Sequence, residues 1–407
     1  MQRRTASALA LVASLGATAA PAQSTVDEGP EERPGAEPAF PAQTNAPAMR
    51  SGAAPATATV ASGLVHPWGL AVLPGDRGYL VTERPGRLRH ISENGTASAP
   101  IAGVPDVFAE EQGGLLDVTL GPDFAETRRV YLTYAKPMGG GTSGTAAARA
   151  TLSADRTELT GVQEIFAQQP PSPTPMHYGS RLVFDGAGHV FITTGEHFTE
   201  RERRLAQDMD TTYGKIVRLT PSGAVPDDNP FADAGTPQAQ IWTRGHRNVQ
   251  GAAMRPGTDE FWVIEHGPQG GDELNLIEPG ANYGWPEVSF GENYDGTPVT
   301  GGDYRHAEAG FTPPRYYWDP VIAPGDMTFY DGAMFAEWQG DILAAGLVSG
   351  GLVRLSLDGD TVTGEERLVS GLGRVRDVDV DQDGSVLVLT DYAEGRLVRL
   401  TADRASN

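Results

Sequence analysis

The sequence predicts an all-β fold, a six-bladed β-propeller built from four-stranded antiparallel sheets. Three observations support this prediction: one repeating unit, strand-like runs at the same place in every unit, and almost no helical periodicity. Each unit contains an apolar run that leads to a turn, an alternating β-rich run, and a shorter strand that often begins near glycine. Self-similar units of about 40–50 residues indicate blades arranged around a central channel.

Six copies of this unit follow one another, and the first is WGLAVLPGDRGYLVTERPGRLRHIS at residues 68–92. The middle run of each copy is rich in β-branched or aromatic residues between turn signals, which is typical of strands. These runs are Tyr79–Thr82, Val130–Tyr134, Val190–Thr194, Phe261–Ile264, Asp341–Ala345 and Val386–Leu389. The rival architecture, a pair of unrelated β-sandwiches, would not repeat one strand order in this way.

The segment before the first unit, TATVASGL at residues 57–64, is predicted to be the outer strand of the last blade. Such pairing closes the ring and leaves no open sheet edge there. The propeller domain is therefore predicted to span residues 57–403. Residues 23–56 are rich in Pro, Ala, Gly and Glu without a periodic apolar pattern, which predicts a flexible leader.

Residues 1–22 combine two arginines, a short apolar stretch and small residues ending in Ala-Pro-Ala, which predicts a secretory signal peptide. No apolar run is long enough to span a bilayer, so the protein is expected in the periplasm or secreted, with no membrane span. Its net charge of −22 argues against nucleic acid as a partner. The absence of cysteine excludes disulfides and thiolate metal sites. Both a monomer and a homodimer are compatible with the sequence.

Unusual side chains recur where each unit begins its first strand. In a propeller blade the start of the first strand and the end of the second share one face, so these side chains are expected around one channel mouth. The six starts are His66-Pro67-Trp68, Gln112-Gly113-Gly114, residues 177–181 (His-Tyr-Gly-Ser-Arg), residues 245–248 (Gly-His-Arg-Asn), the stretch from Trp318 to Gly325, and Arg374-Val375-Arg376.

Each of these positions also has a structural interpretation. A single histidine such as His177 is more often a hydrogen-bonded structural residue, and His246 is predicted to be one. Arg374 and Arg376 alternate in a strand and so share a face, whereas Asp377 and the alternate acids after it should lie on the opposite face. Two like charges on one face favour binding of an external anion, and arginine suits a carboxylate or a phosphate.

A glycine-rich loop, EHGPQGGDELN at residues 265–275, is a candidate cation site. Its glycines and Pro268 impose an irregular backbone whose carbonyls can face Ca²⁺, an ion that prefers oxygen ligands, and three acids lie nearby. A turn with solvated acids explains the stretch equally well, because it does not match an EF-hand loop. No dinucleotide-binding or phosphate-binding glycine motif occurs, which argues against NAD-dependent and P-loop enzymes.

The chain resembles the soluble pyrroloquinoline quinone (PQQ)-dependent glucose dehydrogenase and aldose sugar dehydrogenase family across nearly all of residues 57–403. The segments that carry the likeness, in this order, are GLVHPWGLAVLP, EEQGGLLDVTLGPDF, HYGSRLVFDGAGHVFITTGE, GKIVRLTPSGAVPDDNPF, GHRNVQG, EHGPQGGDELNLIEPGANYGWP and GRVRDVDVDQDG. The resemblance implies a six-bladed propeller. It also implies oxidation of the anomeric carbon of an aldose to the aldonolactone, with hydride transfer to PQQ held over Ca²⁺.

The resemblance implies roles for individual residues. His177 matches the general base that takes the sugar hydroxyl proton, Gln112 a contact to substrate and cofactor, and Arg247 a group that stabilises charge developing on the quinone. The residues implied to bind PQQ are Gln112, Arg247, Asn248, Arg374 and Arg376, with Trp318 as an aromatic at the pocket rim. The main-chain carbonyls of Gly267 and Pro268 match the ligands of the PQQ-bound calcium.

The chain departs from the family pattern at three places. Met176 precedes His177 where the glucose dehydrogenase has an acid that helps to bind sugar, so a preference for glucose is not implied. Val348 or Ser349 stands where the family often has a PQQ-binding lysine, and YYWDPVIAP has one extra residue between Trp and Pro. A calcium-dependent lactonase or a non-catalytic sugar-binding propeller remains the alternative. The natural sugar and the electron acceptor are not identified by the sequence.

Overall fold

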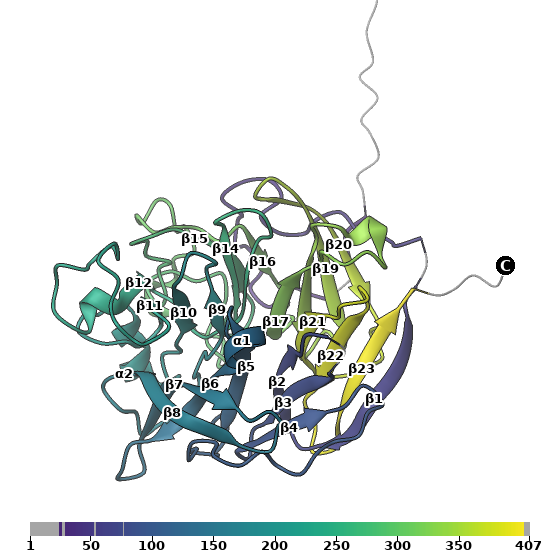
Figure 1. The fold of residues 1–407 in the computed structure, drawn as a ribbon. Coiled ribbons are helices and arrows are strands. Elements are labelled where there is room, and N and C mark those ends of the chain that lie inside the picture. Colours follow the sequence, from purple (N-terminus) through teal and green to yellow (C-terminus); the bar gives the residue numbers. More distant parts are fainter. Residues whose placement is uncertain (1–23, 27–28, 53, 76, 403–407) are drawn as a thin grey trace, which may run out of the picture.

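The computed structural model describes residues 24–26, 29–52, 54–75 and 77–402. Six antiparallel sheets form a ring of blades around a central channel in Figure 1, which confirms the predicted six-bladed β-propeller. The predicted signal peptide, residues 1–22, lies outside the described residues. Within the described part of the chain, no helix is long and apolar enough to cross a membrane.

The blades are numbered here in chain order, and the strands of each run outward from the channel. Blade 1 contains β2 (Pro67–Val72), β3 (Tyr79–Glu83) and β4 (Arg87–Ile91). Blade 2 contains β5 (Leu115–Leu120), β6 (Arg129–Pro137), β7 (Ser143–Leu152) and β8 (Leu159–Ala167). Blade 3 contains β9 (Leu182–Phe184), β10 (Val190–Thr193), β11 (Lys215–Leu219) and β12 (Ile241–Arg244).

Blade 4 contains β13 (Val249–Met254), β14 (Phe261–Glu265), β15 (Asp272–Ile277) and β16 (Tyr316–Trp318). Blade 5 contains β17 (Pro324–Phe329), β18 (Ile342–Gly346), β19 (Leu352–Asp358) and β20 (Thr361–Leu368). Blade 6 contains β21 (Val375–Val380), β22 (Val386–Thr390), β23 (Gly395–Thr401) and, as its outer strand, β1 (Ala56–Leu64). The antiparallel pairing of β1 with β23 confirms the predicted closure of the ring.

Five blades have four strands, whereas the sheet of blade 1 has three within the described residues. An isolated antiparallel bridge between Ile91 and Ala97 continues its pairing outward. Helices are few and short: α1 (Phe124–Thr127), α2 (Glu200–Arg203) and the 3₁₀ turns Arg204–Ala206, Gln238–Gln240, Thr300–Gly302 and Ala336–Trp338. The six middle runs predicted from the sequence all fall on second strands of blades.

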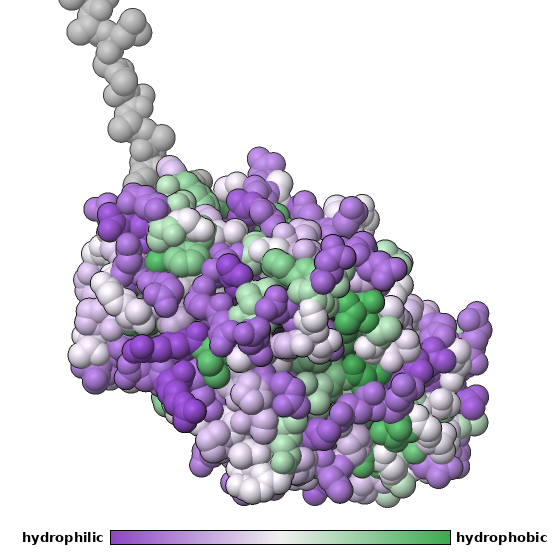
Figure 2. Space-filling view, turned by 90° about the vertical axis from the view of Figure 1, so that its left-hand side faces the viewer, coloured by the Kyte–Doolittle hydropathy of each residue, from purple (hydrophilic) through white to green (hydrophobic). Residues whose placement is uncertain are grey.

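The hydrophobic core is divided among the spaces between blades. Each of the six largest clusters of buried apolar residues lies between two neighbouring blades, which supply nearly all of its members. The cluster between blades 6 and 1 includes Leu387 and Val81, which joins the end of the chain to its beginning. On the face shown in Figure 2, apolar residues form small separate patches among hydrophilic ones, as expected for a domain that buries its apolar surface between blades.

β-Bulges occur at the start of the innermost strand in five blades. The register shifts fall between Pro67 and Leu70, Leu115 and Val118, Val249 and Gly251, Pro324 and Met327, and Val375 and Asp377. A bulge bends the strand and interrupts the alternation of its side chains. Side chains next to each other in sequence are therefore able to reach the channel from the same strand end.

Residues 29–52 lie against blades 4 and 5, and we call this segment the N-terminal strap. The backbone carbonyl of Gln43 accepts a hydrogen bond from the amide of Tyr317 in β16 at 2.8 Å, and the amide of Met49 donates to the carbonyl of Glu365 in β20 at 2.7 Å. Ala46 belongs to the core cluster between these blades. The expected flexible leader is therefore corrected over this range, because the strap pairs with the outer strands β16 and β20 (purple segment, Figure 1).

Candidate active site

His177 lies in the loop before β9, at one mouth of the channel, and its side chain is buried. Its Nδ1 lies 3.2 Å from Oε1 of Glu196, which follows β10. Its backbone amide donates to Oε1 of Gln112 at 2.9 Å, so blades 2 and 3 meet at this residue. His177 has a left-handed backbone with φ of 49°, and strained conformations of this kind are concentrated at functional sites.

Two glycines allow the His177 and Glu196 loops to lie against each other. A Cβ on Gly195 would lie 1.9 Å from the carbonyl oxygen of His177, and a Cβ on Gly179 would lie 2.7 Å from the carbonyl carbon of Thr194. Gly179 also has a positive φ of 63°, which glycine adopts without steric cost. Only glycine fits at these two positions, and the contact places the Glu196 carboxylate beside the imidazole.

The electrostatics of the pair suit a neutral imidazole beside a carboxylate that titrates near neutral pH. Burial lowers the pKa of His177 well below its usual range, and the nearby guanidinium of Arg247 lowers it further. Burial raises the pKa of Glu196 to about 7, against the opposing effect of Arg247. When Glu196 is ionised, its carboxylate accepts the Nδ1 proton of His177 and leaves Nε2 as the basic nitrogen.

Arg247 and Asn248 join this mouth from blade 4. The backbone carbonyl of Arg247 accepts from the amide of Glu196 at 3.1 Å, and Oδ1 of Asn248 accepts from the amide of Gly179 at 3.0 Å. The Arg247 guanidinium donates to the carbonyl of His266 at 3.2 Å. Its Nε is buried and has no hydrogen-bond partner among the described residues. A buried donor without a partner costs free energy, and an acceptor atom of a ligand would satisfy it.

His246, the residue before Arg247, has a structural role, as predicted from the sequence. Its Nδ1 lies 2.8 Å from Oε1 of Glu265, and its Nε2 lies 2.9 Å from the hydroxyl of Thr243. Its ring stacks on Tyr283 with centroids 4.8 Å apart. Glu265 also accepts from the amide of Arg247 at 2.7 Å, so this network fixes the backbone that carries Arg247.

Blades 6 and 1 bring a cluster of arginines to the same end of the channel. Arg376 donates to Oε1 of Gln250 at 2.6 Å and forms an ion pair with Asp391 at 2.8 Å. Burial lowers the pKa of Arg376, and the positive charges of Arg84 and Arg374 lower it further. Asp391 is the carboxylate that offsets this cluster, and Arg376 lowers its pKa to about 2 despite burial. Arg376 is thus paired with Asp391, and the charges of Arg84 and Arg374 lie near it.

The predicted separation of arginines and acids onto opposite faces of β21 is wrong at Asp377. The bulge between Val375 and Asp377 interrupts the alternation, so both side chains after Val375 reach the channel. Asp377 accepts from the guanidinium of Arg181 at 3.2 Å, whereas Arg376 bonds Gln250. The sequence predicts that an external anion neutralises Arg374 and Arg376, whereas in the structure part of this neutralisation comes from Asp391.

Arg181, at the start of blade 3, lies deeper in the channel and contacts all five of the other blades. Its guanidinium bonds Asp117 of blade 2, the carbonyl of Gln250 of blade 4, Asp326 of blade 5 and Asp377 of blade 6 at 2.9–3.2 Å. It also lies over the ring of Trp68 in blade 1, 4.6 Å from the centroid. The carboxylates that meet in the channel thus surround a guanidinium.

The candidate calcium loop joins β14 to β15 next to Arg247. The amide of Gly267 donates to Oδ1 of Asp272 at 2.8 Å, and Oδ2 of Asp272 accepts from the amide of Ala323 at 2.7 Å. Glu265 is occupied by His246 and by the amide of Arg247. Across the described residues, no group of three or more His, Asp or Glu side chains is placed to hold a metal. A cation here would therefore depend on main-chain carbonyls such as those of Gly267 and Pro268.

Trp318 is not brought to the mouth. It ends β16, the outer strand of blade 4, where it is buried in the core cluster between blades 4 and 5 and donates to Glu365 at 3.2 Å. The predicted rim position is therefore corrected, because the Trp318-to-Gly325 stretch begins with the last strand of one blade and not with the first strand of the next. Of the two residues at which the resemblance implies a lysine, Val348 is exposed.

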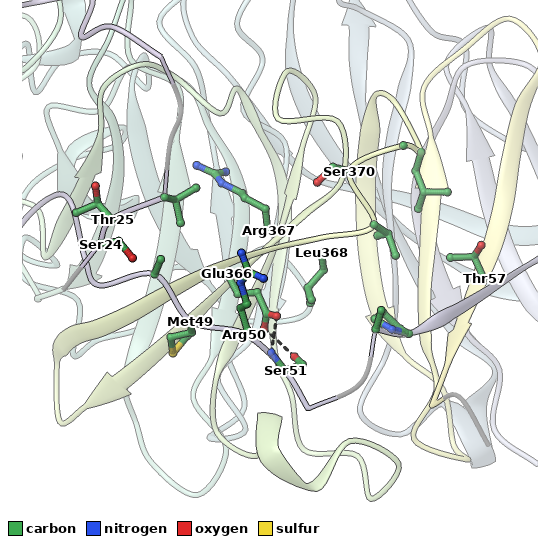
Figure 3. A pocket seen from close by; sticks show the side chains of 17 residues that line it. Ser24, Thr25, Met49, Arg50, Ser51, Thr57, Glu366, Arg367, Leu368 and Ser370 are labelled. Atoms are coloured by element: carbon green, nitrogen blue, oxygen red, sulfur yellow. Dashed lines mark hydrogen bonds between the residues drawn. The ribbon is translucent and has the colours of Figure 1, made fainter. Parts of the chain in front are cut away.

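The cavity at the mouth has a volume of about 410 Å³ and lies against Arg247 and Pro268. Phe198 lines it and also meets the His177 ring edge-on, with centroids 5.2 Å apart. A larger cavity of about 1180 Å³ lies elsewhere, between the strap and β20. There Ser51 bonds Glu366 (Figure 3), and none of the predicted site residues lines it. The larger cavity is therefore separate from the candidate active site.

Two residues of this site were not predicted from the sequence. Glu196 and His266 follow the second strands of blades 3 and 4, on the face where the predicted residues meet. Burial lowers the pKa of His266 well below its usual range, as do the neighbouring Arg247, Arg376 and His177. The carbonyl of His266 accepts from the Arg247 guanidinium, and its Nε2 lies 3.3 Å from Oε1 of Gln250, which also accepts from Arg376. The rule that strand ends share the mouth, applied to every blade, would have identified both residues.

Known proteins resemble this chain over most of its length. A family model described as Glucose / Sorbosone dehydrogenase matches residues 64–399. An aldose sugar dehydrogenase of Escherichia coli is 44% identical over 355 residues, which cover 86% of this chain and 94% of that protein.

Solved structures show this similarity in three dimensions. The soluble aldose sugar dehydrogenase of Escherichia coli in its apo form matches with a TM-score of 0.82 and 42% identity, over 86% of this chain and 99% of that one. The PQQ-bound form of an aldose sugar dehydrogenase from Streptomyces coelicolor matches with a TM-score of 0.70 and 27% identity, over 86% of this chain and 100% of that one.

Proposed function

Because this chain belongs to the glucose and sorbosone dehydrogenase family, we propose that it oxidises the anomeric carbon of aldose sugars to aldonolactones, using PQQ and Ca²⁺. The observation that carries the proposal is the arrangement of His177, Arg247 and Arg376 at one channel mouth. Arg247 donates to the carbonyl of His266, and Gln250 contacts both His266 and Arg376. Glu196 joins His177 to the backbone of Arg247. The PQQ-bound structure of the Streptomyces coelicolor relative supports the choice of cofactor.

The described residues fit a tricarboxylate cofactor at this mouth. Arg374, Arg376 and Arg84 supply positive charge from blades 6 and 1, and the unpartnered Nε of Arg247 supplies a buried donor. Guanidinium groups bind carboxylates through paired hydrogen bonds. We assign Arg84 the charge that the family often takes from the lysine replaced here by Val348 or Ser349. Asn248 and Gln112 complete the proposed contacts, and the carbonyls of Gly267 and Pro268 would hold Ca²⁺.

In the proposed reaction, PQQ polarised by Ca²⁺ supplies the acceptor for the hydride that leaves the anomeric carbon. Nε2 of His177 accepts the proton of the anomeric hydroxyl, so that the C–H bond breaks as the carbonyl of the lactone forms. Glu196 holds the imidazole in the tautomer with Nδ1 protonated. Arg247 contributes a fixed positive charge beside the reacting groups. The electron acceptor that completes turnover is not specified by these residues.

A PQQ titration of the apoprotein tests the proposal. With Ca²⁺ present, we expect saturable PQQ binding by calorimetry and PQQ-dependent dye reduction with aldoses. Replacement of Arg247 by glutamine should weaken PQQ binding by roughly 10- to 100-fold, because a charge-assisted hydrogen bond is lost. Arg149→Gln, on β7 in blade 2, is the matched control and should leave binding unchanged. A wild-type protein with neither PQQ binding nor dye reduction contradicts the proposal.

Replacement of Glu196 by glutamine should change the pH profile of turnover. In the wild type, kcat/KM is expected to rise with pH through about 7, because below its pKa the protonated Glu196 donates to Nδ1 of His177 and leaves the proton on Nε2. The variant cannot titrate there and should lack that step. The matched control is Glu202→Gln, a buried glutamate bonded to Ser172 and Thr174. The same step in Glu196→Gln as in the wild type would remove this role.

The alternative functions have less support from the geometry. A calcium-dependent lactonase needs side-chain oxygens that converge on a metal, whereas Asp117, Asp326 and Asp377 surround the Arg181 guanidinium. Lactone hydrolysis without PQQ would decide in favour of that alternative, and sugar binding without turnover would decide for a binding module. Export to the periplasm or medium through the predicted signal peptide at residues 1–22 is part of the proposal.

A further inference from the structure

The N-terminal strap reaches the loops behind the proposed cofactor site. It lies outside the family match, which begins at residue 64. The guanidinium of Arg33 donates to the carbonyls of Ser289, Gly291 and Gly302, the last at 2.6 Å, and lies 5.4 Å from the ring centroid of Tyr304. One side chain of the strap thus fixes three backbone carbonyls of the segment between β15 and β16.

The same part of the strap holds a second segment, after β16. The amides of Glu32 and Arg33 donate to the two carboxylate oxygens of Asp319 at 2.7 and 2.9 Å. The Glu32 carboxylate accepts from the amide of Val321 at 3.3 Å. Glu32 and Arg33 therefore connect the segment between β15 and β16, through its three carbonyls, with the segment after β16, through Asp319.

Both segments lie directly against the loop that follows Pro268. Gln269 and Glu292 exchange backbone hydrogen bonds of 3.0 and 2.9 Å, and a Cβ on Gly291 would lie 2.2 Å from the carbonyl oxygen of Gly270. On the other side, the amide of Gly271 donates to the carbonyl of Trp318 at 2.9 Å. Residues 269–271 thus lie between the segments before and after β16, both of which are bound by Glu32 and Arg33 of the strap.

We propose that Arg33 is a positioning residue that fixes residues 267–271, so that the Gly267 and Pro268 carbonyls are pre-formed for Ca²⁺ and PQQ. The inference rests on the proposed function for the identity of the ligands. The positioning itself rests only on the contacts of the strap. Groups that orient metal ligands from behind commonly change metal affinity by roughly 10- to 100-fold.

The test compares Arg33→Met with Ser51→Ala in the full chain. Ser51 anchors the same strap to Glu366 and Trp338, on blade 5. Arg33→Met should weaken PQQ and Ca²⁺ binding roughly 10-fold while kcat at saturating cofactor stays close to that of the wild type. Ser51→Ala should leave both affinities unchanged, and Arg33→Lys should restore part of the loss because an ammonium group also donates to carbonyls.

Hydrogen exchange of the cofactor-free protein provides a readout independent of the proposed function. The amides of Gln269, Gly271 and Glu292 should exchange faster in Arg33→Met than in the wild type or in Ser51→Ala. If the wild type binds no PQQ, the proposed function fails, and this exchange measurement alone decides the role of Arg33. If Arg33→Met does not fold, Asp319→Asn tests the same attachment, because it weakens the hydrogen bonds that Asp319 accepts from the amides of Glu32 and Arg33. Unchanged exchange and affinity, or equal changes in the Ser51 variant, would overturn the inference.

Discussion

Replacement of His177 by alanine is expected to lower kcat for aldose oxidation by about 10²- to 10⁴-fold, the usual contribution of a positioned general base. PQQ affinity should change little, because the proposed cofactor contacts come from arginines, Asn248, Gln112 and two backbone carbonyls. Dye reduction by PQQ-saturated protein gives the first quantity, and a PQQ titration followed by calorimetry gives the second. The two measurements together separate loss of the base from loss of the cofactor.

His189→Ala is the matched control for this experiment. His189 also pairs with a carboxylate, that of Asp185 at 2.9 Å, but it lies in the turn between β9 and β10, outside the proposed site. This variant should retain full turnover. Turnover of His177→Ala within a factor of a few of the wild type would remove the assigned role. Loss of PQQ binding in that variant would make His177 a cofactor ligand instead.

The electrostatics of the site have a further consequence for the proposed role of His177 as a base. Without a cofactor, burial and the positive charge of Arg247 hold the pKa of His177 below its usual range. An anionic cofactor placed against Arg247 offsets that positive charge, which moves the His177 pKa back toward neutral pH, where a general base is most effective. The loaded enzyme is therefore expected to have a more basic His177 than the apoprotein.

The fold could be predicted from the sequence because its signals are local and repeated. Apolar runs such as Val386–Leu389 form second strands whose two faces pack against neighbouring blades, and a strand-like segment at residues 57–64 precedes the first unit. The convergence of His177, Arg247 and Arg376 followed from topology alone, since equivalent strand ends of a propeller share one face. A repeat of this kind therefore predicts which residues lie at the same channel mouth, even when no side-chain contact is known.

The errors have physical causes that the repeat does not encode. A bulge before Asp377 changes which side chains enter the channel, and a bulge has no strong sequence signal. The resemblance implies a rim position for Trp318, whereas this residue ends an outer strand that the strap covers. The strap contains few apolar residues, so its attachment through Arg33 and Gln43 to backbone carbonyls leaves no periodic pattern.

The largest expected effect on stability comes from Arg181, which contacts three buried carboxylates and all five other blades. Arg181→Met keeps much of the side-chain volume but leaves Asp117, Asp326 and Asp377 without their cation. Loss of one partner from a buried ionic network costs about 3–5 kcal/mol, so we expect a fall of that size in the free energy of unfolding. Urea and thermal denaturation of the variant and the wild type measure this difference.

The pH dependence of that loss distinguishes uncompensated charge from poor packing. Burial raises the pKa of Asp377 to about 6 and of Asp326 well above its usual range even with Arg181 present, and removal of the cation raises both further. Such carboxyls hold protons in the folded state that the unfolded chain releases, so stability falls as pH rises above about 4. The deficit of Arg181→Met should therefore be larger at pH 8 than at pH 5. A second change, Asp326→Asn, should recover part of it, whereas a deficit independent of pH and of Asp326 would indicate lost packing.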